Sequence, residues 1–154
     1  MNKNNNNIYL FLVLFLFFVQ SVYGKAENYG NVTVSKIVSV YDADTFRRNI
    51  DGWEAIIGKN IPIRANGIDT PEIKCSVRKK GEDECKRLKQ LARTARRLTE
   101  NILKSAKVVE LRNIKRGKYF RILADVFADG RSLADILIKN GVAKKYDGGK
   151  KPVW

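Results

Sequence analysis

The sequence predicts a mainly β fold of the α+β class, with five short strands, one long helix after the third strand and a short helix near the C-terminus. Three observations lead to this prediction. Several segments alternate or concentrate β-branched and apolar residues over strand-like lengths. A longer segment repeats apolar residues at the period of a helix. The order of these segments matches the OB-fold, a five-stranded Greek-key barrel.

Three of the predicted strands precede the long helix. Residues 31–40 are rich in β-branched side chains, and residues 45–50 form the second strand after the turn-like tetrad Tyr41–Asp44. A loop leads to the third strand, residues 60–68, whose proline lies near the start, where a missing N–H is tolerated. The run Asp69–Glu72 then ends this strand. The first and third strands therefore each end beside a pair of acidic residues.

The long helix is predicted by a stripe of apolar residues at spacings of three and four. The stripe consists of Leu88, Leu91, Ala95, Leu98 and Ile102. The helix continues through about Ala106. The other face carries Lys86, Lys89, Arg93, Arg96, Arg97 and Lys104. We expect the apolar stripe to pack on the barrel and the basic face to remain available to a polyanion.

Two further strands and a short helix follow. The strands are predicted over residues 107–114 and 119–127, separated by a basic turn. A capping-box pattern precedes a short helix over residues 133–138, and Gly141 stops it. The basic, glycine-rich tail, residues 144–154, is expected to be loosely ordered.

The 154-residue chain is strongly basic and lacks histidine. It holds 30 Lys and Arg against 16 Asp and Glu, a formal net charge of +14. Without an imidazole, the Ser/His/Asp and Cys/His catalytic sets and two-His zinc sites are excluded. Any chemistry must therefore use carboxylates, Arg, Lys, Tyr, hydroxyls or a metal held by oxygen. The charge favours phosphate polymers, anionic lipids or acidic glycans as partners and does not choose among them.

An apolar run near the N-terminus, residues 8–19, predicts export. Its twelve residues are too few to span a bilayer, which takes roughly 20 in a helix, and suit the core of a signal peptide. Modest side chains before Lys25 favour cleavage after Gly24. The chain then divides into a signal peptide, residues 1–24, and one domain, residues 25–154. The alternative is an uncleaved N-terminal anchor.

Cys75 and Cys85 are the two cysteines of the chain. Export places them in an oxidising compartment, where an even number favours a disulfide. A thiol metal site is poorly supported because no histidine or further cysteine completes it. We therefore predict a Cys75–Cys85 bridge, with free thiols as the alternative.

Carboxylates gather at the predicted strand ends. Asp42 and Asp44 close the first strand, and Asp69 and Glu72 close the third. If these ends adjoin in the barrel, three or four acidic groups converge. Such a cluster persists most easily around a cation, and hard oxygen ligands select calcium, magnesium or manganese. The alternative is that the first pair is an Asx-type turn and the second a strand terminator.

Two arginines lie inside predicted strands. Arg64 and Arg121 are each flanked by apolar residues, where a guanidinium is costly unless it is paired or exposed at a site. Guanidinium groups match phosphate oxygens bidentately. The alternatives are a structural pair with a carboxylate or an ordinary outward-facing barrel residue.

The segments that carry a family resemblance are Val40–Thr45, Ile63–Arg64 with Gly67–Glu72, and Lys118–Arg121. Their order, their spacing and the intervening helix resemble those of the staphylococcal nuclease (thermonuclease) family, from about Val34 to Gly149. The resemblance implies an OB-fold. It also implies a secreted, calcium-dependent phosphodiesterase that cuts DNA and RNA with little sequence specificity and leaves 3′-phosphates.

The resemblance assigns a calcium site to the two acidic segments. Asp44 and Asp69 match the carboxylate ligands, and the backbone carbonyl of Thr70 matches a further ligand. Asp42 matches a residue that lies behind the ligands without touching the ion.

The resemblance also assigns the catalytic and substrate-binding roles. Glu72 matches the residue that positions or deprotonates the attacking water. Arg64 and Arg121 match the two arginines that grip the scissile phosphate. Lys118 and Tyr119 align with residues that line the nucleotide pocket.

Three positions depart from the family's best-known member. Ala43 and Phe120 stand where that member has glycine, so the turn at Ala43 is expected to differ if it requires a positive φ, and the access beside Arg121 is expected to differ as well. Tyr146 lies close to a nucleotide-facing tyrosine but is off register.

The sequence therefore predicts a calcium-dependent nuclease, secreted or periplasmic, that acts as a monomer on single-stranded or locally open DNA and RNA. No stable membrane association is expected after cleavage of the signal peptide. The leading alternative is a noncatalytic OB-fold module that binds nucleic acid, and the complete set of acidic residues and arginines argues against it. A cationic surface-active protein is a third possibility, which requires an exposed apolar helix face.

Overall fold

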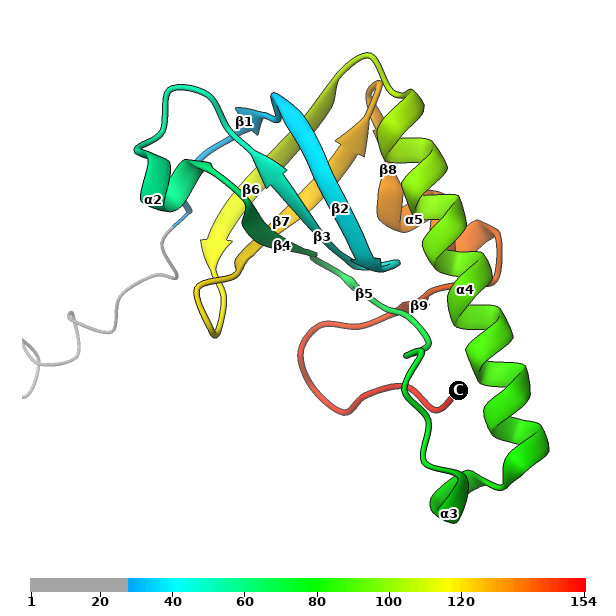
Figure 1. Ribbon diagram of the computed structural model, residues 1–154. Helices are drawn as coiled ribbons and strands as arrows, with labels where there is room; N and C mark the ends of the chain where they lie inside the picture. The colour runs from blue at the N-terminus through cyan, green and yellow to red at the C-terminus, as the bar shows by residue number, and fades with distance from the viewer. Residues whose placement is uncertain (1–27) are drawn as a thin grey trace, which may run out of the picture.

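The structure is a computed structural model that describes residues 28–154. The predicted signal peptide and its cleavage after Gly24 lie outside the described residues. The main sheet has seven strands, of which β8 (Arg131–Ser132) pairs only with β7 and the other six follow the order β1-β6-β7-β4-β3-β2 (Figure 1). These six are β1 (Val32–Thr33), β2 (Lys36–Asp42), β3 (Thr45–Asn49), β4 (Ile61–Ala65), β6 (Val109–Arg116) and β7 (Ile122–Ala128).

The sheet closes on itself through a bend in the first predicted strand. β1 pairs with β6 and β2 pairs with β3, and only Val34 and Ser35 separate these two segments. The Val34 N–H donates to the Val109 carbonyl (2.8 Å), and the Ser35 N–H donates to the Asn49 carbonyl (3.0 Å). β4 and β7 pair in parallel, and the other pairs of the sheet are antiparallel. This is the mainly β OB-fold barrel that the sequence predicts.

The barrel interior is filled by inward-facing apolar side chains. Phe46, Ile63 and Leu111 are fully buried, and Leu133 and Leu137 of α5 (Leu133–Lys139) cover one opening. Along β7 buried and half-buried residues alternate at each position, as expected for a strand with one face on the core. The Ser132 hydroxyl accepts a hydrogen bond from the Asp135 N–H (3.2 Å) and caps α5.

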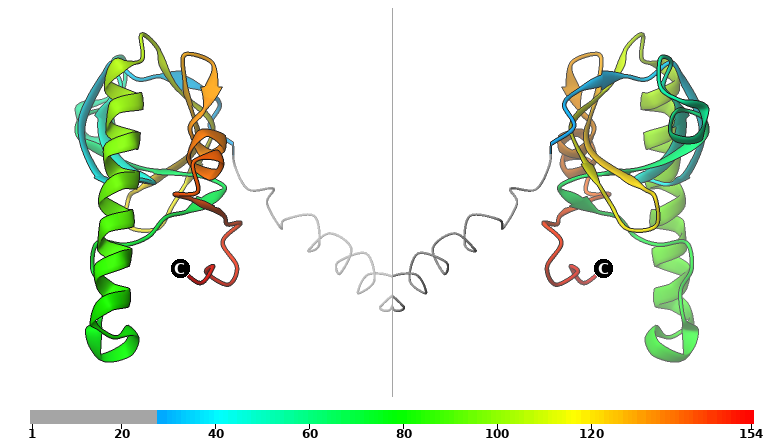
Figure 2. Two further views of the ribbon diagram at one scale, coloured as in Figure 1. Left: turned by 90° about the vertical axis from the view of Figure 1, so that its right-hand side faces the viewer. Right: turned by 90° about the vertical axis from the view of Figure 1, so that its left-hand side faces the viewer.

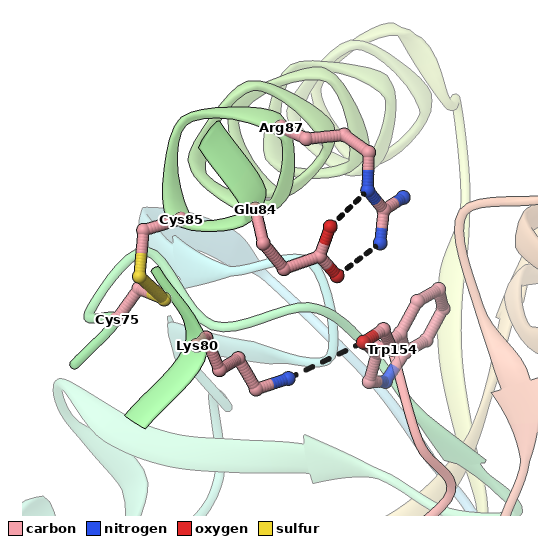
Figure 3. Close-up of a disulfide and its surroundings, with 6 residues drawn as sticks. All are labelled: Cys75, Lys80, Glu84, Cys85, Arg87 and Trp154. Atoms are coloured by element: carbon pink, nitrogen blue, oxygen red, sulfur yellow. Dashed lines mark hydrogen bonds and ion pairs between the residues drawn. A yellow bond between two sulfur atoms is a disulfide. The ribbon is translucent and has the colours of Figure 1, made fainter. Parts of the chain in front are cut away.

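The long helix α4 (Glu82–Ser105) lies along the barrel and extends beyond it (Figure 2). It begins several residues before the predicted apolar stripe because its first turn carries the acidic Glu82, Asp83 and Glu84, which favour a helix N-terminus. A short helix, α3 (Val77–Lys80), precedes it and was not predicted. Cys75 and Cys85 are joined in a disulfide that fastens this segment to α4 (Figure 3).

Several short elements differ from the predicted pattern. The loop before β4 contains α2 (Ala55–Gly58), and the predicted third strand is interrupted at Asn66–Gly67, where Gly67 has φ +78°. β5 (Ile68–Asp69) follows this turn and pairs with β9 (Lys144–Lys145) of the tail. β8 (Arg131–Ser132) pairs antiparallel with the end of β7.

The hairpin before β7 also departs from the prediction. Tyr119 and Phe120 both have φ +57° and form a turn, so the strand begins at Ile122 instead of residue 119. This conformation is uncommon for bulky residues. Among residues 28–154 no helix is both long enough and apolar enough to cross a membrane.

Candidate active site

The turn between β2 and β3 is held by its neighbours. The Thr99 hydroxyl, buried on α4, donates to the Ala43 carbonyl (2.8 Å), and the Ala65 N–H at the end of β4 donates to the Asp44 carbonyl (2.8 Å). Ala43 is buried and is not among the described residues with positive φ. The turn therefore does not need glycine, and alanine fits it without strain.

Two buried carboxylates meet at one guanidinium. Asp44 and Asp69 are each 3% exposed, and Arg64 contacts both, at 3.1 Å from Asp44 Oδ2 and 3.5 Å from Asp69 Oδ1. Thr70, next to Asp69, is buried as well. Burial raises the pKa of Asp44 above its ordinary value, and the charge of Arg64 partly opposes that rise. The ends of β2 and β5 thus adjoin, as the sequence predicts.

The other two predicted acidic residues lie at the margin of this pair. Burial raises the pKa of Asp42, and the negative charges of Asp44 and Glu72 raise it further. Glu72 is exposed, with its side chain 61% accessible. A buried pair and an exposed carboxylate beside it can divide their roles, because only the exposed one can exchange protons freely with solvent.

The tail lies against these carboxylates. Lys151 Nζ is 2.7 Å from Glu72 Oε1 and 3.6 Å from Asp69 Oδ1. The Trp154 indole N–H donates to Asp69 Oδ2 (3.0 Å). The hydrogen bond to Glu72 raises the pKa of Lys151. The expectation of a loosely ordered tail is therefore wrong in this structure, because acidic groups of the site bind its cations.

Further contacts hold the tail in place. Lys144 of β9 donates to the Val153 carbonyl (2.6 Å), and its ammonium lies 4.8 Å from the centre of the Trp154 ring. Lys80 of α3 donates to the Trp154 carbonyl (3.2 Å), next to the Cys75–Cys85 disulfide (Figure 3). The tail thus bridges the site and the segment that the disulfide fastens to α4.

The acidic residues do not form a ready-made metal cluster. Within the described part of the chain, no group of three or more His, Cys, Asp or Glu residues could hold a metal ion. The expected convergence of three or four carboxylates is therefore reduced to the pair Asp44 and Asp69, because Arg64 lies between them and Lys151 binds Glu72. The donor set still fits a hard cation, since it consists of oxygen atoms from two carboxylates and from neighbouring backbone.

The hairpin before β7 lies near the start of β4, whereas the acidic pair lies near the end of β4. Arg121 immediately precedes the Ile63–Ile122 pair, two residues before Leu123, which lies opposite Arg64. Arg64 and Leu123 are half-buried between inward-facing neighbours, so Arg121 belongs to the same outer face by alternation. Lys118 and Tyr119 lie on the exposed tip. The described contacts include no ion pair between Arg121 and the acidic residues.

The staphylococcal nuclease homologue family model matches residues 62–152, which include most of β4, the acidic segment Asp69–Glu72, α4 and the hairpin, while the Asp42–Asp44 turn precedes the matched range. The chain belongs to this family. Endonuclease YncB of Bacillus subtilis (strain 168) is 34% identical over 115 residues, which cover 71% of this chain and 48% of that protein. The SPbeta prophage-derived endonuclease YokF of the same organism is 33% identical over 102 residues, 58% of this chain and 31% of that protein. The chain thus spans about half or less of these curated relatives.

Sequence reasoning missed the residues that hold the site from outside. The sequence does contain a sign of the role of Thr99, because it lies beside the apolar helix stripe, four residues after Ala95. A polar side chain buried at such a position needs a hydrogen-bond partner. Lys151 and Trp154 had none, because their contacts with Glu72 and Asp69 depend on the path of the tail across the site.

Proposed function

We propose that this protein is a calcium-dependent nuclease that hydrolyses DNA and RNA and leaves 3′-phosphates. The observation that carries the proposal is the pair of buried carboxylates, Asp44 and Asp69, at one guanidinium with Glu72 beside them. The family membership and the names of the endonuclease relatives support it. A polyanionic substrate also suits a chain of net charge +14.

The side chains divide the work of phosphodiester hydrolysis. Arg64 and Arg121 bind the non-bridging oxygens and stabilise the negative charge that grows on them in the transition state. Glu72 orients a water molecule and accepts its proton as the oxygen attacks phosphorus. The bond from phosphorus to the 5′-oxygen then breaks, and that oxygen takes a proton from solvent. The products are a 3′-phosphate and a 5′-hydroxyl.

Asp44, Asp69 and the Thr70 carbonyl are the residues that would hold calcium. When bound, a dication supplies positive charge to the phosphate and makes water more acidic. Burial favours such a ligand, because one guanidinium is shared by the two carboxylates and the second cation nearby, Lys151, approaches only Asp69.

We also propose that the protein acts outside the cytoplasm, in the periplasm or the medium. The apolar run at residues 8–19 supports export, and a disulfide suits an oxidising compartment. The proposed substrates are single-stranded or locally open DNA and RNA, bound by a monomer, since an unpaired strand exposes its bases as well as its phosphates to the protein.

The test compares Glu72→Gln with the wild type on single-stranded DNA in saturating calcium. If Glu72 accepts the proton, the variant loses on the order of 10² or more in kcat. Removing calcium with EGTA abolishes cleavage by the wild type. Glu82→Gln is the matched control, because Glu82 is an exposed glutamate at the start of α4, and it keeps wild-type activity.

Two results would contradict the proposal. Wild-type-like cleavage by folded Glu72→Gln would remove the assigned base. Binding of DNA without any calcium-dependent cleavage by the wild type would favour the noncatalytic OB-fold module. Circular dichroism confirms in each case that the variant is folded.

A further inference from the structure

A second concave site lies at the end of the barrel away from the acidic residues. It is a pocket of about 610 Å³ between α2, the start of β4 and the hairpin before β7. Its walls are mainly apolar and include Trp53, Ile57, Ile61 and Phe120. Lys115 and Arg116 line it together with Glu54, so two positive charges face one negative charge. Pockets of this size with apolar walls and a few convergent polar groups are typical of ligand sites.

A buried cation lies behind one wall of this pocket. Arg48 is 0% exposed, and among residues 28–154 none of its three guanidinium nitrogens has a hydrogen-bond partner. The guanidinium carbon lies 5.6 Å from the centre of the Trp53 ring. An uncompensated charge in a barrel interior is costly. The fold therefore retains a positive potential beneath the pocket, which an anionic ligand would offset.

The hairpin presents an aromatic ring to the same pocket under strain. Phe120 has φ +57° and is 79% exposed, so the fold stabilises neither its backbone conformation nor its ring by burial. Its ring lies 5.6 Å from the Arg116 guanidinium. Strain of this kind persists mainly where function uses it. Phe120 also directly precedes Arg121, so the pocket adjoins one of the two arginines that are proposed to bind the scissile phosphate.

We infer that this barrel-end pocket binds an unpaired base of the substrate strand, beyond the two nucleotides that flank the scissile phosphate. The base stacks on Phe120 and Trp53, and the adjacent phosphate binds Lys115 and Arg116. Aromatic rings and cations in one pocket suit the bases and phosphates of a single strand. This inference rests on the proposed nuclease function, and it goes further by placing a subsite that selects single strands.

The test measures binding of fluorescent oligothymidine of about twelve nucleotides by anisotropy, in EGTA so that nothing is cleaved. Phe120→Gly is the decisive variant, because glycine adopts φ +57° without strain and the protein stays folded. We expect its Kd to rise about tenfold, the scale of one lost base stack. Val108→Ala is the matched control, since Val108 is also exposed but precedes the far end of β6, and its Kd stays unchanged.

Substrate length separates this inference from the proposed function. Cleavage of a thymidine dinucleotide, which spans only the scissile phosphate, stays near wild type in Phe120→Gly, while kcat/KM for the longer strand falls. An unchanged Kd for the longer strand would overturn the pocket and leave the nuclease intact. Equal losses on both substrates would place Phe120 at the scissile phosphate instead and also overturn it. Binding of decanoate that oligothymidine does not displace would assign the pocket to an aliphatic anion.

Discussion

Arg48 places a guanidinium inside the barrel on the inward face of β3, where the neighbouring inward residues, Phe46 and Ile50, are apolar. Burial lowers the pKa of Arg48 from its ordinary value to about 10. Between about pH 10 and the ordinary pKa of arginine the unfolded chain binds more protons than the folded one, so the free energy of unfolding rises with pH there. At neutral pH both states are protonated and the full penalty remains.

Arg48→Met therefore stabilises the protein at pH 7. We expect the free energy of unfolding to rise by about 1–3 kcal/mol, because methionine fills the space without a charge to desolvate. Urea unfolding with the disulfide intact measures it. Arg47→Met is the matched control, since Arg47 is exposed and donates to the Asn60 carbonyl, and it gives no gain. A loss of stability in Arg48→Met would mean that the guanidinium has a compensating partner in solution.

The same substitution should weaken binding of oligothymidine, since it removes the positive potential beneath the barrel-end pocket. Stability would then rise while affinity falls, which is the usual relation at a functional site.

The buried position of Arg48 could not be assigned from the sequence. Because Arg48 alternates with Phe46 and Ile50, the pattern predicts that its side chain faces inward. A charged residue at such a position is equally consistent with a β-bulge that turns the side chain to solvent.

The acidic pair was easier to predict than its surroundings. Asp44 lies in the turn after β2 and Asp69 is the last residue of β5, and strand ends in a small barrel adjoin, so their proximity follows from topology. The contact of Arg64 with both was open, because a strand arginine fits a structural pair as well as a phosphate. In the structure Arg64 pairs with both carboxylates. A phosphate must therefore compete with the carboxylates for Arg64, and a cation must compete with Arg64 for the carboxylates.

At the scale of elements, the tail after β9 is the segment that most changes the site. Lys151 binds Glu72 at 2.7 Å and approaches Asp69 at 3.6 Å. Its ammonium therefore lies beside the carboxylate that is proposed to hold calcium. A cation of the chain and a calcium ion repel each other at such distances. The hydrogen bond from Lys151 also occupies one oxygen of the Glu72 carboxylate.

Lys151→Met is therefore expected to bind calcium about three- to tenfold more tightly than the wild type, measured by calorimetry without substrate. The size is that of a partly exposed charge interaction, since the Lys151 side chain is 55% accessible. Lys150→Met is the matched control, because it removes an equal charge from an exposed neighbour that is in none of the described ion pairs. Equal or weaker affinity in Lys151→Met would show that the tail does not compete with calcium.

Elements with a strong pattern were predicted well, and elements fixed by tertiary contact were not. The stripe of Leu88, Ala95 and their neighbours gives α4 unambiguously, and the capping pattern gives α5. α2, β5 and β9 are too short for any periodicity to appear, and β9 forms only because β5 offers an edge. The start of β7 shifted because Tyr119 and Phe120 read as strand residues but adopt positive φ.

At the scale of the whole molecule, the positive charge is distributed around the site. Arg93, Arg96 and Arg97 are exposed on α4, and Arg96 lowers the pKa of Asp42, so this face adjoins the acidic turn. Arg96 also lines a groove of about 410 Å³ with Arg47 and Thr45. A strand bound at the site can therefore extend along α4, where its phosphates meet these arginines.

Replacing Arg93, Arg96 and Arg97 together with Gln is expected to weaken binding of single-stranded DNA and to flatten its salt dependence. Each lost phosphate contact removes about 0.7 from the slope of log K against log salt, so three contacts remove about 2. The chemical step at saturating substrate keeps its rate, because the site carboxylates are unchanged. Anisotropy titrations in EGTA from low to moderate salt give the slope.

The matched control removes the same charge elsewhere, by replacing Lys107, Arg131 and Lys139 with Gln. These residues are exposed near the C-terminal end of α4, on β8 and at the end of α5. If binding follows a path along α4, the control keeps most of the wild-type slope. Equal flattening in both triple variants would instead mean that the net charge of +14 acts as a diffuse field, without a defined track for the strand. The distinction matters for the barrel-end pocket as well, because a strand with a fixed path along α4 reaches that pocket in one direction only.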